Sequence, residues 1–172
     1  FGEYLVPLGA DKKPISLPFN VEGETKWCWK RNPNTNEFIK YPEDKLIGAE
    51  GLGVSLEPSN LIVADGDMIE TSPFMSELPD TYTTGKKLNG KTLIRQKLYK
   101  SETRPKAISY GKDTDDGCCV ELLVNGQSKL LGADRIVIDN RKPTVLNNGA
   151  LEDVQETIRK IYAWSMLSKY YP

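Results

Sequence analysis

The hydrophobic and polar positions of this chain follow one pattern over most of its length and another near its C-terminal end. Short apolar runs bounded by Gly, Asn, Asp and Pro recur, for instance at 61–64, 119–124 and 136–138. Runs of this length, rich in Val, Ile and Leu and separated by turn residues, indicate β-strands. The pattern therefore predicts a mainly β chain in which antiparallel hairpins form a sandwich or barrel-like domain.

A helical period begins after Gly149. Acidic residues fill the first turns of this segment and basic residues the later ones, which suits the helix dipole. We therefore expect a C-terminal amphipathic helix over 150–169, with Asn148 as its N-cap. Apolar residues recur there at three- and four-residue spacing, as in a helix with one buried face: Leu151, Val154, Ile158, Ile161 and Tyr162.

The far end of this predicted helix carries more apolar surface than one face can bury. Two interpretations stay open, a terminal helix that is simply docked on its own domain and a partner-binding end. The candidate partner-binding residues are Trp164, Met166, Leu167, Tyr170 and Tyr171.

Two Asn-Gly pairs predict tight hairpin turns, because Asn-Gly tolerates the positive φ angles of a type I′ turn. Asn89-Gly90 joins the approach at 82–87 to a strand over 92–99. Asn125-Gly126 separates the run at 119–124 from residues 127–131, and this is the clearest hairpin signal in the chain.

The remaining segments are defined by turn residues. Proline interrupts residues 1–24 repeatedly, which predicts an extended N-terminal arm. A hairpin is expected over 25–41, around the turn cluster Asn32-Pro33-Asn34-Thr35-Asn36. The strand at 62–64 is expected to turn at 65–67 and return at 68–70, ahead of a loop over 71–84.

Length and charge narrow the class of protein. A chain of 172 residues fits a single domain over 1–172 with a core of its own. The 23 basic and 24 acidic side chains balance, which argues against a nucleic-acid surface. The longest apolar runs are about four residues, far short of the roughly 20 that span a bilayer. The nearest approach to a basic stripe is expected to be a solvated strand edge: Lys86, Lys87, Lys91, Arg95, Lys97 and Lys100.

The chain contains no histidine. This excludes Ser-His-Asp and Cys-His catalysis, an imidazole general base and histidine metal ligands. Carboxylate chemistry, as in glycosidases, needs no histidine and stays open. The sequence predicts a protein that is not an enzyme and needs no cofactor.

Three cysteines and two acidic turns are the remaining candidates for chemistry. Cys28 is expected to be either a buried thiol or the partner of Cys118 or Cys119 in a disulfide. Two acidic clusters offer oxygen ligands of the kind that calcium prefers, although acidic turns are more often only solvated. They are Asp65, Asp67 and Glu70, and Asp113, Asp115 and Asp116.

Residues 83–97 read Thr-Thr-Gly-Lys-Lys-Leu-Asn-Gly-Lys-Thr-Leu-Ile-Arg-Gln-Lys. This stretch resembles a segment that recurs in bacteriophage tail-fibre and receptor-binding proteins. In that family a threonine-glycine step leads to a short strand, an Asn-Gly or Asp-Gly turn and a strand that ends in a basic pair. The resemblance implies a place in a virion and transfers no binding residues.

Two classes of function follow from these observations. The first is a non-catalytic structural or interaction subunit of a larger assembly, such as a phage virion. It would bind protein partners or copies of itself, and it would be located in a virion or outside the cell. The second is a carbohydrate-binding or carboxylate-dependent carbohydrate-active β domain. Its stacking platform would be Trp27, Trp29 and Tyr41, with carboxylates from the turn at 65–70.

Overall fold

The computed structural model describes residues 2–112 and 119–172. The chain divides into two compact units, which are described separately below. Unit 1 comprises Phe1–Ser59 and Gly126–Ala133, and unit 2 comprises Asn60–Asn125 and Asp134–Pro172. Strands hold 41% of the residues and helices 24%, so the predicted mainly β class with a C-terminal helix is confirmed. The single domain over 1–172 stays a prediction.

Unit 1 contains a three-stranded antiparallel sheet and a separate hairpin. The sheet has the order β1-β4-β10, and the hairpin joins β2 to β3. Two short helices complete the unit. The elements are η1 (Gly2–Tyr4), β1 (Leu5–Leu8), β2 (Leu17–Val21), β3 (Glu24–Cys28), α1 (Glu43–Ile47), β4 (Gly51–Ser55) and β10 (Gln127–Leu131).

The N-terminal residues are extended, as expected, but they do not form a free arm. β1 pairs with β4, and Val6 and Leu8 are buried in one cluster with Ile39 and Tyr41. Pro7, which lies within β1, is compatible with this sheet because β1 is its edge strand.

The hairpin expected over 25–41 does not form, because its first strand pairs with an earlier segment. Residues 24–28 pair with 17–21 instead, through a turn at Glu22-Gly23 where both residues have positive φ (52° and 86°). Two successive positive φ angles are the backbone of a tight hairpin turn, and the sequence pattern did not reveal it because glutamate is not a typical residue there. The predicted turn at 32–36 does form, and the Arg31–Phe38 bridge closes it.

Unit 2 is a seven-stranded sheet covered by helices. The sheet has the order β11-β6-β7-β5-β9-β8, and β12 adds a parallel pairing to the end of β7. The elements are β5 (Leu61–Gly66), η2 (Ile69–Glu77), β6 (Tyr82–Leu88), β7 (Lys91–Ser101), β8 (Ile108–Tyr110), β9 (Val120–Leu123), β11 (Ile136–Asp139), β12 (Thr144–Leu146) and α2 (Asn148–Tyr170).

The first Asn-Gly turn is confirmed. Asn89 and Gly90 have φ angles of 50° and 75° and connect β6 to β7. The strand that follows is not an edge, however, because β7 lies between β6 and β5. Lys97 is accordingly buried and donates hydrogen bonds to the backbone oxygens of Leu78 and Pro79.

The second Asn-Gly turn does not make a hairpin. Gly126 has the expected positive φ of 80°, but β9 pairs with β5 and β8, whereas β10 pairs with β4. The two strands that flank the turn therefore belong to different sheets and different units. Local turn chemistry sets the backbone at Gly126, and non-local partners decide the strand pairing.

Residues 68–70 do not return as a strand. Ile69 and Glu70 instead begin η2, whose N-terminal turn is held by the Thr71 hydroxyl donating to the backbone oxygen of Met68. Thr71 and Met75 are fully buried, so tertiary packing favours the helical turns over a strand here.

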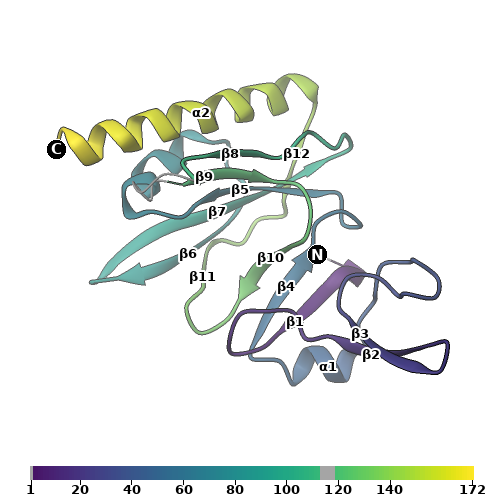
Figure 1. The fold of residues 1–172 in the computed structure, drawn as a ribbon. Coiled ribbons are helices and arrows are strands. Elements are labelled where there is room, and N and C mark those ends of the chain that lie inside the picture. Colours follow the sequence, from purple (N-terminus) through teal and green to yellow (C-terminus); the bar gives the residue numbers. More distant parts are fainter. Residues whose placement is uncertain (1, 113–118) are drawn as a thin grey trace. The chain divides into compact units, whose positions relative to one another are not determined.

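The predicted C-terminal helix is confirmed and is slightly longer than expected. Its N-cap is Asn147 rather than Asn148, with the Asn147 side chain accepting from the backbone N–H of Ala150. α2 packs on η2, β9 and β12 (Figure 1). None of the described helices is both long and apolar enough to cross a membrane. The buried face of α2 consists of Leu151, Val154, Ile158, Ile161 and Ser165.

Candidate functional site

The far end of α2 is the first candidate surface, and the structure divides its predicted residues into two groups. Trp164 packs on Phe74 with ring centroids 5.8 Å apart, and it lies half-buried against the core of unit 2. Leu167, Tyr170 and Tyr171 remain 57%, 52% and 81% exposed. Met166 is half-buried. The buried face of the helix thus ends at Ser165, and Leu167, Tyr170 and Tyr171 beyond it face solvent.

The three residues of the predicted carbohydrate platform do not share one exposed surface. Trp27 is 66% exposed on β3, and Trp29 is half-buried. Tyr41 is buried, and its hydroxyl donates to the backbone oxygen of Ile15 at 2.6 Å. Burial raises the pKa of Tyr41 to about 12. Its ring is therefore part of the core of unit 1, and only Trp27 offers a largely open ring.

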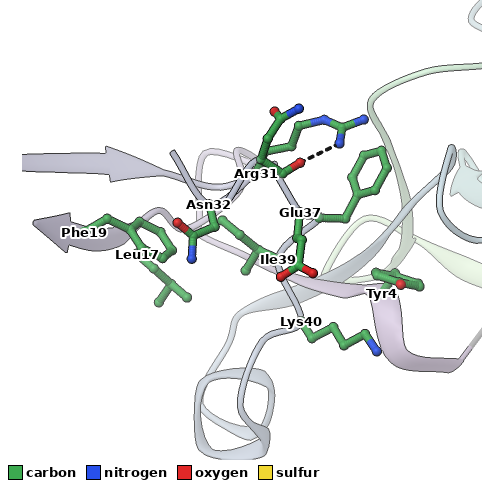
Figure 2. A pocket seen from close by; sticks show the side chains of 10 residues that line it. Tyr4, Leu17, Phe19, Arg31, Asn32, Glu37, Ile39 and Lys40 are labelled. Atoms are coloured by element: carbon green, nitrogen blue, oxygen red, sulfur yellow. Dashed lines mark hydrogen bonds between the residues drawn. The ribbon is translucent and has the colours of Figure 1, made fainter. Parts of the chain in front are cut away.

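Unit 1 contains an open pocket of about 730 Å³ that the sequence did not predict (Figure 2). In this view Leu17 and Phe19 lie at one side and Tyr4 at the other, with Asn32 and Glu37 between them. Only the turn cluster at 32–36 was a sequence signal for it. The lining consists of Tyr4, Leu17, Phe19, Arg31, Asn32, Asn36, Glu37, Phe38, Ile39 and Lys40.

Cations lie over two of the aromatic rings of this pocket, those of Phe38 and Tyr4. The Arg31 guanidinium carbon lies 3.6 Å from the centroid of the Phe38 ring, a cation–π contact. Its Nη1 donates to the backbone oxygen of Asn36 at 2.8 Å. Tyr4 meets Phe38 edge to face, with centroids 6.4 Å apart, and Lys40 Nζ lies 5.4 Å from the Tyr4 centroid. The Phe38 and Tyr4 rings and the turn thus have contacts within the protein that hold them in place before any ligand arrives.

A group of interacting polar residues lies in unit 2, around Asp65. This residue is only 9% exposed, and it lies on β5 directly opposite Gln96 of the neighbouring strand β7. Burial, reinforced by the nearby Asp67 carboxylate, raises the pKa of Asp65 to about 7. Gln96, Arg95 and Arg135 act in the opposite direction and are outweighed. A carboxyl group that titrates near neutrality can exchange protons at physiological pH, but this one is nearly closed to solvent.

The nearby Asp67 is engaged in an ion pair. Its carboxylate lies 2.8 Å from Arg95 Nη2. Asp67, Cys119 and Glu121 place one ligand atom each within 4.8 Å of one another. Glu121 also accepts from the Ser109 hydroxyl and lies 3.7 Å from Lys112 Nζ. Asp67 Oδ1 and Glu121 Oε1 are therefore already engaged by cations or donors of the protein, and these contacts compete with any metal ion for the trio.

Two of the three cysteines, Cys28 and Cys119, lie among the described residues. Cys28 and Cys119 are free thiols, so the disulfide between these two is absent. Cys118 and the acidic cluster Asp113, Asp115 and Asp116 lie outside the described residues. Burial and the carboxylates of Glu121 and Asp67 raise the pKa of the Cys119 thiol to about 11. Cys119 is therefore a neutral thiol at physiological pH.

This pKa predicts slow alkylation of Cys119. Because the thiolate is the reacting form, its fraction at pH 8 should be about 100-fold smaller than for a thiol with the ordinary value of 9. We expect iodoacetamide to modify Cys119 much more slowly than the same cysteine in the urea-unfolded chain, with mass spectrometry reading each site. Equal rates in the folded and unfolded chain would contradict a raised pKa.

Neither a protein-family model nor a curated protein matches this sequence.

Proposed function

We propose that this protein is a non-catalytic interaction subunit that self-associates through the end of α2. The observation that carries the proposal is the change of face along this helix. Its apolar stripe is buried as far as Ser165, whereas Leu167, Tyr170 and Tyr171 beyond it are exposed. We call these three residues the terminal patch.

The chemistry of the terminal patch suits a protein partner. Tyr side chains are enriched at protein interfaces because they offer a large ring together with a hydroxyl that can be hydrogen-bonded. Leu167 and Tyr170 are three residues apart and so lie on one face of the helix. A contact of two such faces around a twofold axis would bury the same patch of each copy, the commonest arrangement in homo-oligomers.

The experiment uses a double variant in which both Leu167 and Tyr170 are replaced by glutamate. We expect the purified protein to have a mass at least twice 19.3 kDa by light scattering after size exclusion, and the double variant to return to 19.3 kDa. The matched control is Lys160→Glu, an exposed position of the same helix that changes the net charge by the same amount.

Truncation is a less suitable test. Removing residues 163–172 would delete Trp164 and the buried Ser165, and removing residues 1–20 would delete the buried strand β1. A parent protein that stays at 19.3 kDa over the whole concentration series would contradict self-association through the terminal patch.

The wider assembly is a prediction based on the resemblance of residues 83–97. These residues occupy the hairpin β6–β7 of unit 2. A phage virion would be one setting for a self-associating, mainly β subunit of this kind.

A further inference from the structure

The pocket of unit 1 suits a small neutral, polar ligand in size and in preorganisation. Its volume of about 730 Å³ lies in the range of roughly 300–1,000 Å³ that holds small organic ligands. The turn that forms one wall is fixed by backbone hydrogen bonds, with Asn36 N–H donating to the Asn32 oxygen at 2.8 Å and Asn32 N–H donating to the Glu37 oxygen at 2.9 Å. A preformed wall reduces the entropy lost on binding.

The charges of this region cancel. Lys40 Nζ lies 2.7 Å from Glu3, and Glu57 receives both Lys30 at 2.6 Å and Arg31 at 3.7 Å. Together with Glu37, three carboxylates therefore face three cations. Since both pocket cations already have carboxylate partners, neither a phosphate nor another strong anion finds a free counter-charge here.

The polar groups that remain for a ligand are planar and can form paired hydrogen bonds. In the part of the chain that the structure describes, no side-chain hydrogen bond or ion pair occupies the Glu37 carboxylate or the Asn36 amide. The Asn32 amide oxygen accepts from the backbone N–H of Asn34, whereas its NH₂ group donates to none of the described residues. These groups offer both donors and acceptors, as vicinal hydroxyl groups require.

Apolar surface lies beside these polar groups. Leu17 and Phe19 line one side of the pocket, and Tyr4 lines another (Figure 2). A sugar ring presents both kinds of surface at once, because its hydroxyl groups lie around the rim and its C–H groups form an apolar face that packs on aromatic side chains. A purely apolar ligand would leave the amide and carboxylate groups unpaired.

We infer that the pocket of unit 1 is a binding site for a neutral saccharide of one or two rings. Glu37, Asn36 and Asn32 hydrogen-bond its hydroxyl groups, and Phe19 and Tyr4 pack against its C–H groups from different sides of the pocket. This site is separate from the Trp27, Trp29 and Tyr41 platform, and it does not depend on self-association through α2.

The test begins with an array of neutral and acidic glycans probed with the whole chain, followed by calorimetric titration of each oligosaccharide that binds. We expect binding to neutral glycans that is insensitive to salt. Glu37→Ala should weaken it about 10- to 100-fold, the usual loss for a hydrogen bond to a charged group. Asn36→Gly should also weaken it; glycine accepts the φ of 61° at this position and keeps the backbone oxygen that Arg31 uses.

Two control variants distinguish this pocket from other surfaces of unit 1. Glu24 lies at the exposed end of β3, outside the pocket, so Glu24→Ala should bind glycans like the parent chain. Trp27→Ala removes the most exposed tryptophan and should also have no effect. Absence of any glycan binding, loss of binding with Trp27→Ala but not Glu37→Ala, or salt-sensitive binding of acidic glycans alone would each overturn the inference. Thermal unfolding of every variant checks that unit 1 remains folded.

Discussion

Replacing Asp65 by asparagine should stabilise the protein at pH 8 and leave its stability at pH 4 almost unchanged. Asp65 is 9% exposed in the middle of the unit 2 sheet, beside the Asp67 carboxylate. Ionising it in this place costs free energy because both burial and the neighbouring charge oppose the negative form. Asparagine keeps the shape of the side chain and never ionises.

The sign and size of the effect follow from the pKa of Asp65. In the folded protein the pKa is about 7, above the value of 3.8 of the unperturbed group. The folded state therefore binds the proton more tightly than the unfolded chain between these values, and the free energy of unfolding falls as pH rises from about 4 to 7. A pKa difference of about three corresponds to about 4 kcal/mol, which is the largest gain expected for Asp65→Asn at pH 8.

The measurement is urea unfolding at pH 4, 6 and 8. With Trp27 and Trp29 replaced by phenylalanine, Trp164 becomes the only tryptophan, and its fluorescence reports on unit 2 alone. Asp153→Asn, an exposed position on α2, serves as the control and should change stability by about 0.5 kcal/mol or less at each pH. An Asp65→Asn variant with the same pH dependence as the parent chain would show that Asp65 ionises normally.

The second large effect is expected from Ile158→Ala. Ile158 is fully buried in the core of unit 2, where α2 covers the sheet. Truncation removes apolar contacts and leaves a cavity that the surrounding structure only partly fills. We expect the free energy of unfolding of unit 2 to fall by about 2–5 kcal/mol, measured through the same Trp164 fluorescence.

Leu167→Ala is the matched comparison on the same helix. Leu167 is 57% exposed, so its truncation should change stability in the monomer by about 0.5 kcal/mol or less. The contrast tests the division of α2 into a buried face and the terminal patch. Equal losses for the two variants would mean that Leu167 supports the fold, and the terminal patch would then lose its main apolar residue as a docking surface.

Part of the candidate surface could be predicted from the sequence. The helical period after Gly149 predicted α2 and its excess of apolar residues, and Leu167, Tyr170 and Tyr171 are indeed exposed. Trp164 was grouped with them because periodicity cannot show which part of a long helix still has a partner. Trp164 instead contacts Phe74 on η2, 90 residues earlier in the chain, and is half-buried.

The pocket of unit 1 could not be predicted, because its walls come from separate segments. Tyr4, Phe19 and the turn at 32–36 meet only once η1, β2 and the turn are folded together. Each segment by itself carries an ordinary pattern of polar and apolar residues. Only the Asn-rich turn was visible as a local feature.

The sequence by itself determined the features whose physics is local. The positive φ angles favoured by Asn89-Gly90 set one turn and its hairpin, and the 3.6-residue period set α2. The tertiary structure alone decided strand partners and burial. Gly126 has the positive φ that Asn125-Gly126 predicted, yet the flanking strands join different sheets, since strand pairing depends on packing partners far along the chain. The burial of Asp65, which moves its pKa to about 7, has the same non-local origin, because strands β7 and β9 enclose it.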